Sequence, residues 1–454
     1  MGRVSLQQAA AWCGGHVDPK FGNTQFFGAS IDSRNVQPGQ LFVAVQGVRD
    51  GHDFISMALE RGAAAVLCTH CDGDYPAIVV EDTRRALGDI ARGERQRLGM
   101  KVVGVTGSVG KSTTKEMIAC VLGSTYRTRK SPMNHNNDLG LPMAILALPE
   151  DTEVAVLEMG MNHFREIAYL TAIARPDVAV IINIGTMHIE HLGSAEGILQ
   201  AKLEILEGVP ESGKVILNGD DQLLWNAHRI LNKSAAYFGV QNTECDVLGS
   251  HVVQDGGTLR YDVRHGEQAF SVELPLDGQH FVLDSLAAVA VGLEMGVSPE
   301  KIHASLAEFQ NMSGRQEILH AKGCTIIKDC YNAGPESMAA ALAVLGSKPG
   351  RHVAVLGDML ELGACSQAEH YRVGRIAAEK ADIVLAYGPN GCRVISGALT
   401  GGMPDVRAKA FEDRKELVAA LKRMSKPGDV ILFKGSHGMH MELALELFLK
   451  EEDT

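Results

Sequence analysis

The run Lys101–Thr113 places a glycine-rich turn between an apolar stretch and a polar segment that can begin a helix. Gly107 and Gly110 allow backbone N–H groups to curl around phosphate oxygens, and the start of the following helix adds partial positive charge. Lys111 is then placed to reach the β- and γ-phosphates, and the Ser112 hydroxyl to bind Mg²⁺. The run therefore predicts an ATP-type nucleotide site made of Gly107, Ser108, Val109, Gly110, Lys111, Ser112 and Thr113.

The spacing departs from the usual phosphate-loop pattern at one position. The pattern G-x-x-x-x-G-K-[ST] would place a glycine where the chain has Val105, and the nearest glycine, Gly104, comes one residue early. A glycine-rich turn with an incidental lysine is the alternative interpretation. The order of strand, turn and helix around Gly-Lys-Ser-Thr favours the nucleotide site.

Polar side chains follow the next two apolar runs along the chain. Glu158 comes directly after the run 154–157, and His188 follows shortly after the run 178–182. Because ligands of open α/β sheets bind beyond the carboxyl ends of the strands, we predict that Ser112, Glu158 and His188 form a metal site. The alternatives are that Glu158 caps a helix and that His188 is a turn residue, since histidine is an uncommon Mg²⁺ ligand.

Other candidates lie near the two ends of the chain. Arg315 can clamp a phosphate with its planar guanidinium, and Asp329 can contact the nucleotide or a second substrate. Near the start, Asp32-Ser33-Arg34 and the loop 47–54 can hold a second anionic ligand. For each of these residues a surface turn is the alternative. Lys202 lies in an acidic helical segment, and its immediate surroundings favour a solvated lysine paired with Glu204 or Glu207.

The elements that would position these residues follow an α/β pattern. Short, almost wholly apolar runs alternate with helical segments from about residue 98 to 240, and again from about residue 314. Strands buried on both faces of a parallel sheet have this composition, so we expect two parallel sheets in separate domains. The stretch 240–280 alternates polar and apolar residues, which predicts added antiparallel strands.

Composition restricts the class of protein. The chain has 454 residues, 45% of them hydrophobic and 22% charged, which indicates a folded protein of several domains. The net charge of −12 argues against a nucleic-acid partner. The nine scattered cysteines and the lack of a long apolar run predict a reduced, cytoplasmic protein without a membrane span.

Taken in order, these blocks resemble the Mur ligase family of peptidoglycan synthesis. A phosphate loop alone is common to many nucleotide-hydrolysing enzymes, whereas the ordered set is specific and covers essentially the whole chain. The blocks are Asp32–Arg34, Gly47–Phe54, Thr106–Thr113, Asn134–Asn137, Leu157–Asn162, Asn183–His188, Ala201–Glu204, Tyr331–Pro335, Gly357–Gly363 and Lys434–Ser436.

The resemblance implies three α/β domains. Residues 1–85 would bind the UDP-sugar peptide, residues 86–313 would form the central ATP-binding domain with its parallel sheet, and residues 314–454 would form a Rossmann-like ligase domain. The implied reaction joins D-Ala-D-Ala to UDP-N-acetylmuramoyl-tripeptide through an acyl phosphate, with ATP and Mg²⁺. The chain would act as a monomer.

The resemblance also implies roles for individual residues. Lys202 would be carbamylated by CO₂, which turns a cation into an oxygen ligand for Mg²⁺ beside Ser112, Glu158 and His188. The implied catalytic residues are Lys111, Glu158, His188, Lys202 and Arg315. The implied nucleotide contacts outside the phosphate loop are His280, Asp284, Arg315 and Asp329. The implied substrate contacts are Ser33, Arg34, Asp50, Gly51, His52, Asn134, Asn136, Asn137, Tyr331 and Asn332.

The chain departs from its relatives at the expected adenine site. Many relatives carry His-Asn-x-x-Asn where this chain has His280-Phe281-Val-Leu-Asp284. Asp284 can accept a hydrogen bond from the adenine amino group, while Phe281 offers only packing. Two other functions stay open: another Mur-type or folylpolyglutamate-type ligase, and a nucleotide-binding module that has lost catalysis.

Overall fold

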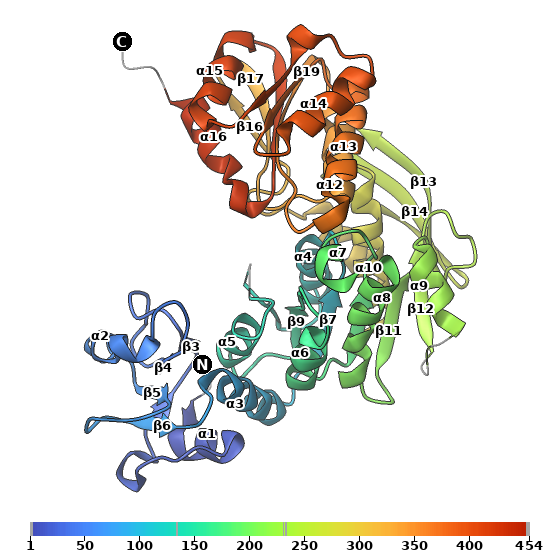
Figure 1. Cartoon of the computed structure of the whole chain (residues 1–454). Helices are drawn as coiled ribbons and strands as arrows, with labels where there is room; N and C mark the ends of the chain where they lie inside the picture. Colours follow the sequence, from blue (N-terminus) through green and yellow to red (C-terminus); the bar gives the residue numbers. More distant parts are fainter. Residues whose placement is uncertain (1–2, 133–134, 230, 232–233, 451–454) are drawn as a thin grey trace.

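The structure, a computed structural model, describes residues 3–132, 135–229, 231 and 234–450. Its described elements form three sheets of four, nine and six strands, together with a separate two-stranded pair. Figure 1 shows the three parts following one another along the chain, from the N-terminal part in blue to the C-terminal part in red. The α/β class expected from the sequence is confirmed.

The N-terminal sheet is parallel throughout, in the order β3-β4-β5-β6. Its short strands are largely buried because they lie between helices and the rest of the core. The elements are β1 (Val4–Ser5), α1 (Leu6–Cys13), β2 (Gln25–Phe26), β3 (Ala29–Ser30), β4 (Leu41–Val43), α2 (Ile55–Glu60), β5 (Ala65–Cys68) and β6 (Ala77–Val79).

Helix α3 (Thr83–Leu98) joins the N-terminal sheet to the central domain. Its first turn is capped by Asp82, whose side chain accepts hydrogen bonds from the backbone N–H groups of Arg84 and Arg85. One face packs on α6 (Glu166–Ala174), where Gly88 leaves no room for a side chain: a Cβ would lie 2.2 Å from the Tyr169 hydroxyl. Figure 1 shows α3 between the N-terminal sheet and the central helices α5 (Gly140–Leu146) and α6.

The central sheet has the strand order β15-β14-β13-β12-β11-β10-β7-β9-β8. From β8 to β13 neighbouring strands are parallel, and β13, β14 and β15 are antiparallel, as expected for residues 240–280. The strands are β7 (Lys101–Thr106), β8 (Thr128–Lys130), β9 (Val154–Glu158), β10 (Val178–Ile181), β11 (Lys214–Asn218), β12 (Ala235–Gly239), β13 (Val247–Asp255), β14 (Thr258–His265) and β15 (Gln268–Leu274).

Both faces of this sheet are covered, which explains its apolar strands. In β7, Val103 and Val105 pack in one core with α4 (Lys111–Gly123) and α10 (His280–Glu294), while Val102 packs in the other with α3, α5 and α6. Successive side chains of a strand point to opposite faces, so a strand covered on both sides must be apolar throughout. The remaining described helices here are α7 (Ile189–Leu192), α8 (Ala195–Leu203), α9 (Gln222–Asn226) and α11 (Pro299–Ala307).

The C-terminal domain confirms the second parallel sheet. Its order is β16-β17-β21-β18-β19-β20, and only the edge strand β16 is antiparallel to its neighbour. Its strands are β16 (Glu317–Ala321), β17 (Cys324–Asp329), β18 (Arg351–Gly357), β19 (Ile383–Tyr387), β20 (Ala408–Phe411) and β21 (Asp429–Lys434). Its helices are α12 (Pro335–Ser347), α13 (Ser366–Lys380), α14 (Gly391–Thr400), α15 (Arg414–Met424) and α16 (Met441–Leu449).

The domain boundaries at residues 85 and 313 stay predictions. A search of the described residues finds no helix long and apolar enough to cross a membrane. The central sheet carries the phosphate loop, which lies between β7 and α4.

Candidate active site

The phosphate loop leaves the middle of the central sheet, because β7 lies between β9 and β10. Gly110, the residue before α4, has a φ of 86°, a conformation that favours glycine. A Cβ at this position would lie 2.4 Å from an Asp284 carboxylate oxygen, so the site also lacks room for a side chain. Val105, where the usual pattern has glycine, is a buried residue within β7 and not part of the turn.

The side chain of Asn183 holds this loop in place. Its Oδ1 accepts hydrogen bonds from the backbone N–H groups of Ser108 at 3.0 Å and Val109 at 2.9 Å, and its Nδ2 donates to the Val109 carbonyl. The Ser108 hydroxyl in turn accepts from the Gly185 N–H at 2.8 Å. Asn183 begins one of the blocks named in the sequence analysis but had no predicted role, and the structure shows that it fixes the loop.

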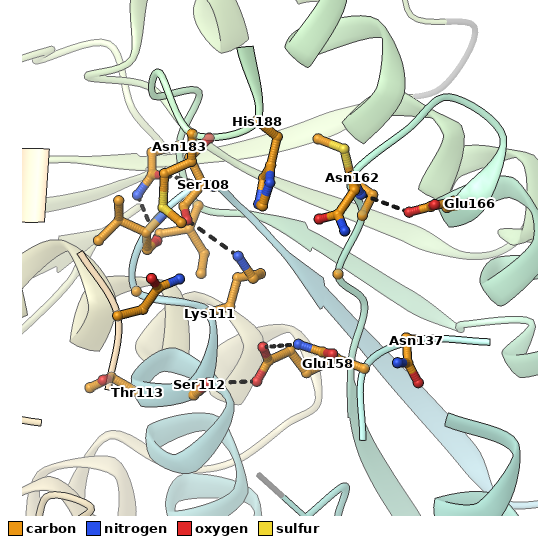
Figure 2. Close-up of a pocket in the computed structure, with 18 of the residues that line it drawn as sticks. Ser108, Lys111, Ser112, Thr113, Asn137, Glu158, Asn162, Glu166, Asn183 and His188 are labelled. Atoms are coloured by element: carbon orange, nitrogen blue, oxygen red, sulfur yellow. Dashed lines mark hydrogen bonds between the residues drawn. The ribbon is translucent and has the colours of Figure 1, made fainter. Parts of the chain in front are cut away.

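Lys111 folds back over the loop that precedes it. Its Nζ donates to the carbonyl of Gly107 at 2.8 Å. It also donates to the carbonyl of Ser108 at 3.2 Å (Figure 2). Burial lowers the pKa of Lys111, the Glu158 carboxylate opposes that change, and the nearby Arg315 guanidinium lowers it further. A phosphate would replace the two carbonyls as the partner of this ammonium group.

Ser112 and Glu158 form a buried oxygen-rich pair. The Ser112 hydroxyl donates to Glu158 Oε2 at 2.7 Å (Figure 2). The Asn136 amide donates to Oε1 at 2.9 Å. Burial acts to raise the pKa of Glu158, but Lys111 and these hydrogen bonds outweigh it, so the pKa is lowered. An ionised carboxylate beside a hydroxyl is a donor set that suits Mg²⁺.

The surroundings of Lys202 contradict the solvated lysine that its sequence neighbours favoured. The residue is 1% exposed, and its ammonium has no hydrogen-bond or ion-pair partner within the part of the chain that the structure describes. Glu204 instead accepts from backbone N–H groups at 2.8 and 3.1 Å, and Glu207 pairs with an arginine. Helix α8 turns Lys202 inward, while the neighbouring Glu204 and Glu207 bind other groups.

Burial, and secondly the charge of Lys111, lower the pKa of Lys202 well below its usual value. A neutral amine is the form that reacts with CO₂, so this environment fits a carbamate. Among the described residues no group of three or more His, Cys, Asp and Glu side chains could hold a metal ion. The metal site of Ser112, Glu158, His188 and carbamylated Lys202 stays a prediction, of which the structure shows the Ser112–Glu158 pair.

His188 lies between the central and C-terminal domains. Its backbone has a φ of 65°, and its Nδ1 is 2.7 Å from a carboxylate oxygen of Glu361. Figure 2 shows the imidazole beside Lys111 and above Glu158. The contact with His188 is the main cause that lowers the pKa of Glu361, with burial opposing it.

The C-terminal domain contributes Arg315 and Asp329. The Arg315 guanidinium donates to the Ser112 hydroxyl at 2.9 Å and lies 4.3 Å from the Tyr331 ring centre, so it reaches the predicted metal position from across the domain interface. Asp329 accepts from Lys434 at 2.6 Å in a buried pair, and Lys434 also donates to the Asn332 carbonyl.

Burial shifts the pKa values of the two polar residues at the expected adenine site, His280 and Asp284. Burial lowers the pKa of His280 to about 4, and its Nε2 lies 3.2 Å from the Gln316 amide. Burial raises the pKa of Asp284 to about 7, although a hydrogen bond from Thr114 partly opposes the rise. Both residues therefore favour their neutral forms more than an exposed histidine or aspartate does.

A cavity of about 1350 Å³ brings most of the predicted residues together. Gly107 and Lys202 do not line it, and neither do the five residues predicted in the N-terminal domain. Asn134 lies outside the described residues. The predicted residues that line the cavity are Ser108, Val109, Gly110, Lys111, Ser112, Thr113, Asn136, Asn137, Glu158, His188, His280, Asp284, Arg315, Asp329, Tyr331 and Asn332.

The N-terminal candidates form two polar loops of their own. Arg34 pairs with both carboxylate oxygens of Asp32 at 2.9 Å, and these bonds hold the pKa of Asp32 at about 2. Asp50 accepts from His52 Nδ1 at 2.6 Å, and the opposite nitrogen of this ring accepts from the Thr69 N–H. Ser33 is buried, and Gly51 lies so close to the backbone that follows β4 that a Cβ would be 2.6 Å from the Val45 nitrogen.

Comparison with known proteins agrees with this arrangement. The profile of the Mur ligase middle domain matches residues 105–292, that of the glutamate ligase domain matches 314–437, and that of the catalytic domain matches 26–95. The UDP-N-acetylmuramoyl-tripeptide–D-alanyl-D-alanine ligase of Bacillus subtilis is 41% identical over 94% of each chain. The chain belongs to the Mur ligase family.

Solved structures give the same result. MurF from Acinetobacter baumannii is 32% identical, with a TM-score of 0.91 over 99% of this chain and all of the other. MurF from Thermotoga maritima in complex with ADP is 31% identical, with a TM-score of 0.83 over 94% of this chain and 97% of the other. The three-part α/β architecture is thus shared with other Mur ligases.

Two further residues of this Mur ligase site were not predicted. Lys115 is fully buried and donates to the Ser131 carbonyl at 2.8 Å, next to the Ser131 hydroxyl that accepts from the Glu158 N–H. Glu336, in the first turn of α12, accepts from the N–H and hydroxyl of Thr186 across the domain interface at 3.2 and 3.0 Å. For Lys115, its position three residues after Ser112 is a signal that could have found it.

Proposed function

We propose that this chain is an ATP-dependent ligase that joins D-Ala-D-Ala to the terminal carboxylate of UDP-N-acetylmuramoyl-tripeptide during the synthesis of peptidoglycan precursors. The observation that carries the proposal is the assembly of Lys111, the Ser112–Glu158 pair and Arg315 around one cavity. Relatives that bear this ligase name match the chain over more than nine-tenths of its length. ATP use is supported by the ADP complex of the Thermotoga maritima relative.

In the first step the phosphate loop and Lys111 hold the ATP phosphates. A carboxylate oxygen of the tripeptide attacks the γ-phosphorus, the bond from that phosphorus to the bridging oxygen breaks, and ADP leaves. Arg315 neutralises charge that develops on the transferred phosphoryl group, which is the main requirement of this chemistry. The product is an acyl phosphate.

Mg²⁺, when bound, would neutralise phosphate charge as a Lewis acid. Ser112, Glu158, His188 and carbamylated Lys202 would hold it. This assignment is supported by the lowered pKa of Glu158 and by the buried amine of Lys202, which has no partner within the described residues.

In the second step the amine of D-Ala-D-Ala attacks the acyl carbon. The tetrahedral intermediate expels phosphate, and the nitrogen loses its proton as the amide forms. Water must be kept from the acyl phosphate until then, because hydrolysis would waste it. Residues of the C-terminal domain, among them Arg315, Tyr331 and Asn332, cover the central site and would exclude water.

The remaining assignments divide the substrates among the three domains. Residues 1–85 would bind the UDP-sugar through Ser33, Arg34, Asp50, Gly51 and His52. Residues 86–313 would bind the nucleotide, with Asp284 and His280 at the adenine and Asn134, Asn136 and Asn137 at the peptide. Residues 314–454 would complete the site with Arg315, Asp329, Tyr331 and Asn332.

We further propose that the chain acts in the cytoplasm as a monomer. All nine cysteines, each of them a described residue, are free thiols, which fits a reducing compartment. Size-exclusion chromatography with light scattering would test the oligomeric state, and a mass of twice that of the chain would contradict it.

The proposed reaction is tested by omission. Purified protein with ATP, Mg²⁺, UDP-N-acetylmuramoyl-tripeptide and D-Ala-D-Ala should release ADP and phosphate and form the amide product, detected by mass spectrometry. Omitting any one component should stop product formation. A parallel reaction with a reduced folate and glutamate tests the alternative ligase, and product in that reaction alone would overturn the proposal.

A further inference from the structure

One wall of the cavity carries basic side chains that the reaction described above does not use. Arg84, Arg85 and Arg92 of α3 line the same cavity as the phosphate loop. Arg85, Asp89 and Arg92 are spaced four and three residues apart, so they form one stripe along the helix. The stripe runs beside the face on which Gly88 packs against α6.

Two of these arginines have partners and one does not. Arg92 pairs with Asp89 at 2.7 Å, and Arg84 pairs with Asp138 at 2.7 Å. The guanidinium of Arg85 is exposed and makes no hydrogen bond or ion pair with any residue that the structure describes. Arg85 therefore offers the cavity five side-chain N–H donors that no described residue uses, while Asp82, the other charge of this wall without an ion pair, caps the helix.

The position of Arg85 in its helix does not stabilise a positive charge. It lies in the first turn of α3, where the helix dipole opposes a positive side chain. The N–H groups of that turn are already satisfied by Asp82. The guanidinium of Arg85 therefore has no described partner within the fold and can bind an anion.

The placement of α3 indicates which anion comes near. The helix lies between the N-terminal sheet and α6 (Figure 1), and its basic wall faces the cavity that contains Lys111 and Glu158. A substrate held by the N-terminal domain and phosphorylated at the phosphate loop must span this wall. The proposed substrate has two parts between its UDP end and its reacting carboxylate, the N-acetylmuramoyl sugar and the peptide, and of these only the peptide carries free carboxylates.

We propose that Arg85 binds a carboxylate of the tripeptide other than the one that is phosphorylated. The inference rests on the proposed function. Two groups share this chemistry: the free carboxylate of the D-glutamyl residue, and the side-chain carboxylate of the third residue when that residue is diaminopimelate. Arg85 suits both because its planar guanidinium binds a carboxylate through two parallel hydrogen bonds.

The test compares Arg85→Gln, Arg85→Lys and the wild type on three UDP-N-acetylmuramoyl-tripeptides. The first contains D-glutamate and diaminopimelate, the second D-glutamate and lysine, and the third D-isoglutamine and diaminopimelate. The matched control is Arg129→Gln, an exposed arginine of β8 that does not line the cavity. Steady-state kinetics give KM and kcat, and calorimetric titration with each nucleotide peptide gives Kd without turnover.

For the first peptide we expect Arg85→Gln to raise KM and Kd roughly tenfold, with kcat unchanged, because one charged hydrogen-bonded pair is lost. Arg85→Lys should recover part of the affinity, and Arg129→Gln should match the wild type. If the lysine peptide is insensitive to the substitution, the third residue supplies the carboxylate. If the isoglutamine peptide is insensitive, the D-glutamyl residue supplies it.

Two results would overturn the inference. Unchanged KM and Kd for all three peptides would show that Arg85 binds no carboxylate of the substrate. Equal weakening of the Kd for UDP-N-acetylglucosamine, which has the diphosphate but neither peptide nor carboxylate, would show that the residue binds the diphosphate instead. Wild-type product formation with at least one peptide tests the proposed function itself, so the two failures are distinct.

Discussion

The Asp284→Asn variant should be more stable than the wild type at pH 8 and nearly as stable at pH 4. Burial is the main cause that raises the pKa of Asp284 from 3.8 to about 7, and the Thr114 hydrogen bond and the Arg315 charge reduce the rise. The folded protein therefore holds this proton more tightly than the unfolded chain does. The resulting stabilisation is complete below about pH 4 and is lost as the pH rises through 7.

The size of the expected difference in the free energy of unfolding follows from the pKa shift of Asp284. A rise from 3.8 to about 7, at 1.36 kcal/mol per pKa unit, corresponds to about 4 kcal/mol in the free energy of unfolding. The residue is only 6% exposed, so solvent screens little of this. An asparagine cannot ionise, and its amide oxygen can still accept from Thr114, so the substitution removes the cost and keeps the contact.

Urea unfolding between pH 4 and pH 8, extrapolated linearly to water, would measure the difference between the two proteins. The control is Asp255→Asn, whose side chain is 76% exposed and therefore keeps its contact with water in the folded protein. A stability difference between Asp284→Asn and the wild type that is the same at every pH would refute the reasoning.

Three further predictions concern the metal and phosphate sites. Lys202→Met should reduce turnover roughly 100-fold or more, measured as ADP release. It should also raise the melting temperature, measured by scanning fluorimetry, because it removes a buried amine without a partner among the described residues. A lower melting temperature would contradict the burial argument. Gly110→Ala should weaken ATP binding at least about tenfold, since its φ is 86° and the new Cβ would meet Asp284 at 2.4 Å; unchanged affinity in a calorimetric titration would refute it. Glu158→Gln should raise the Mg²⁺ concentration needed for half-maximal turnover, and an unchanged Mg²⁺ titration would remove Glu158 from the proposed metal site.

The structural features that depend on local sequence pattern could be predicted. The apolar runs marked the parallel strands because both faces of the central sheet are covered, and the phosphate loop followed from the spacing of Gly107, Gly110 and Lys111. The burial of Lys202 could not be predicted in this way. Its neighbours in sequence are acidic. Burial, the main cause that lowers its pKa, depends on tertiary packing, and the second cause, Lys111, is distant in sequence.

Contacts between domains could not be predicted from the sequence either. Arg315 reaches Ser112, and Glu336 reaches Thr186, only because the C-terminal sheet lies against the end of the central one. Nothing in the spacing of these residues sets that arrangement. Arg85 illustrates the same limit, since an arginine in the first turn of a helix carries no sequence signal of the cavity that it faces.

The hydrogen bonds of Asn183 have a consequence for nucleotide binding. Ordering a residue of flexible backbone costs roughly 1–2 kcal/mol, and a phosphate loop that becomes ordered only around its ligand would lose that amount of affinity for each residue. Here the side-chain amide of Asn183 accepts two hydrogen bonds and donates one, and these bonds hold Ser108 and Val109 without a contribution from phosphate. The entropy of the loop is therefore lost when the protein folds, so more of the contact energy remains available to bind the nucleotide.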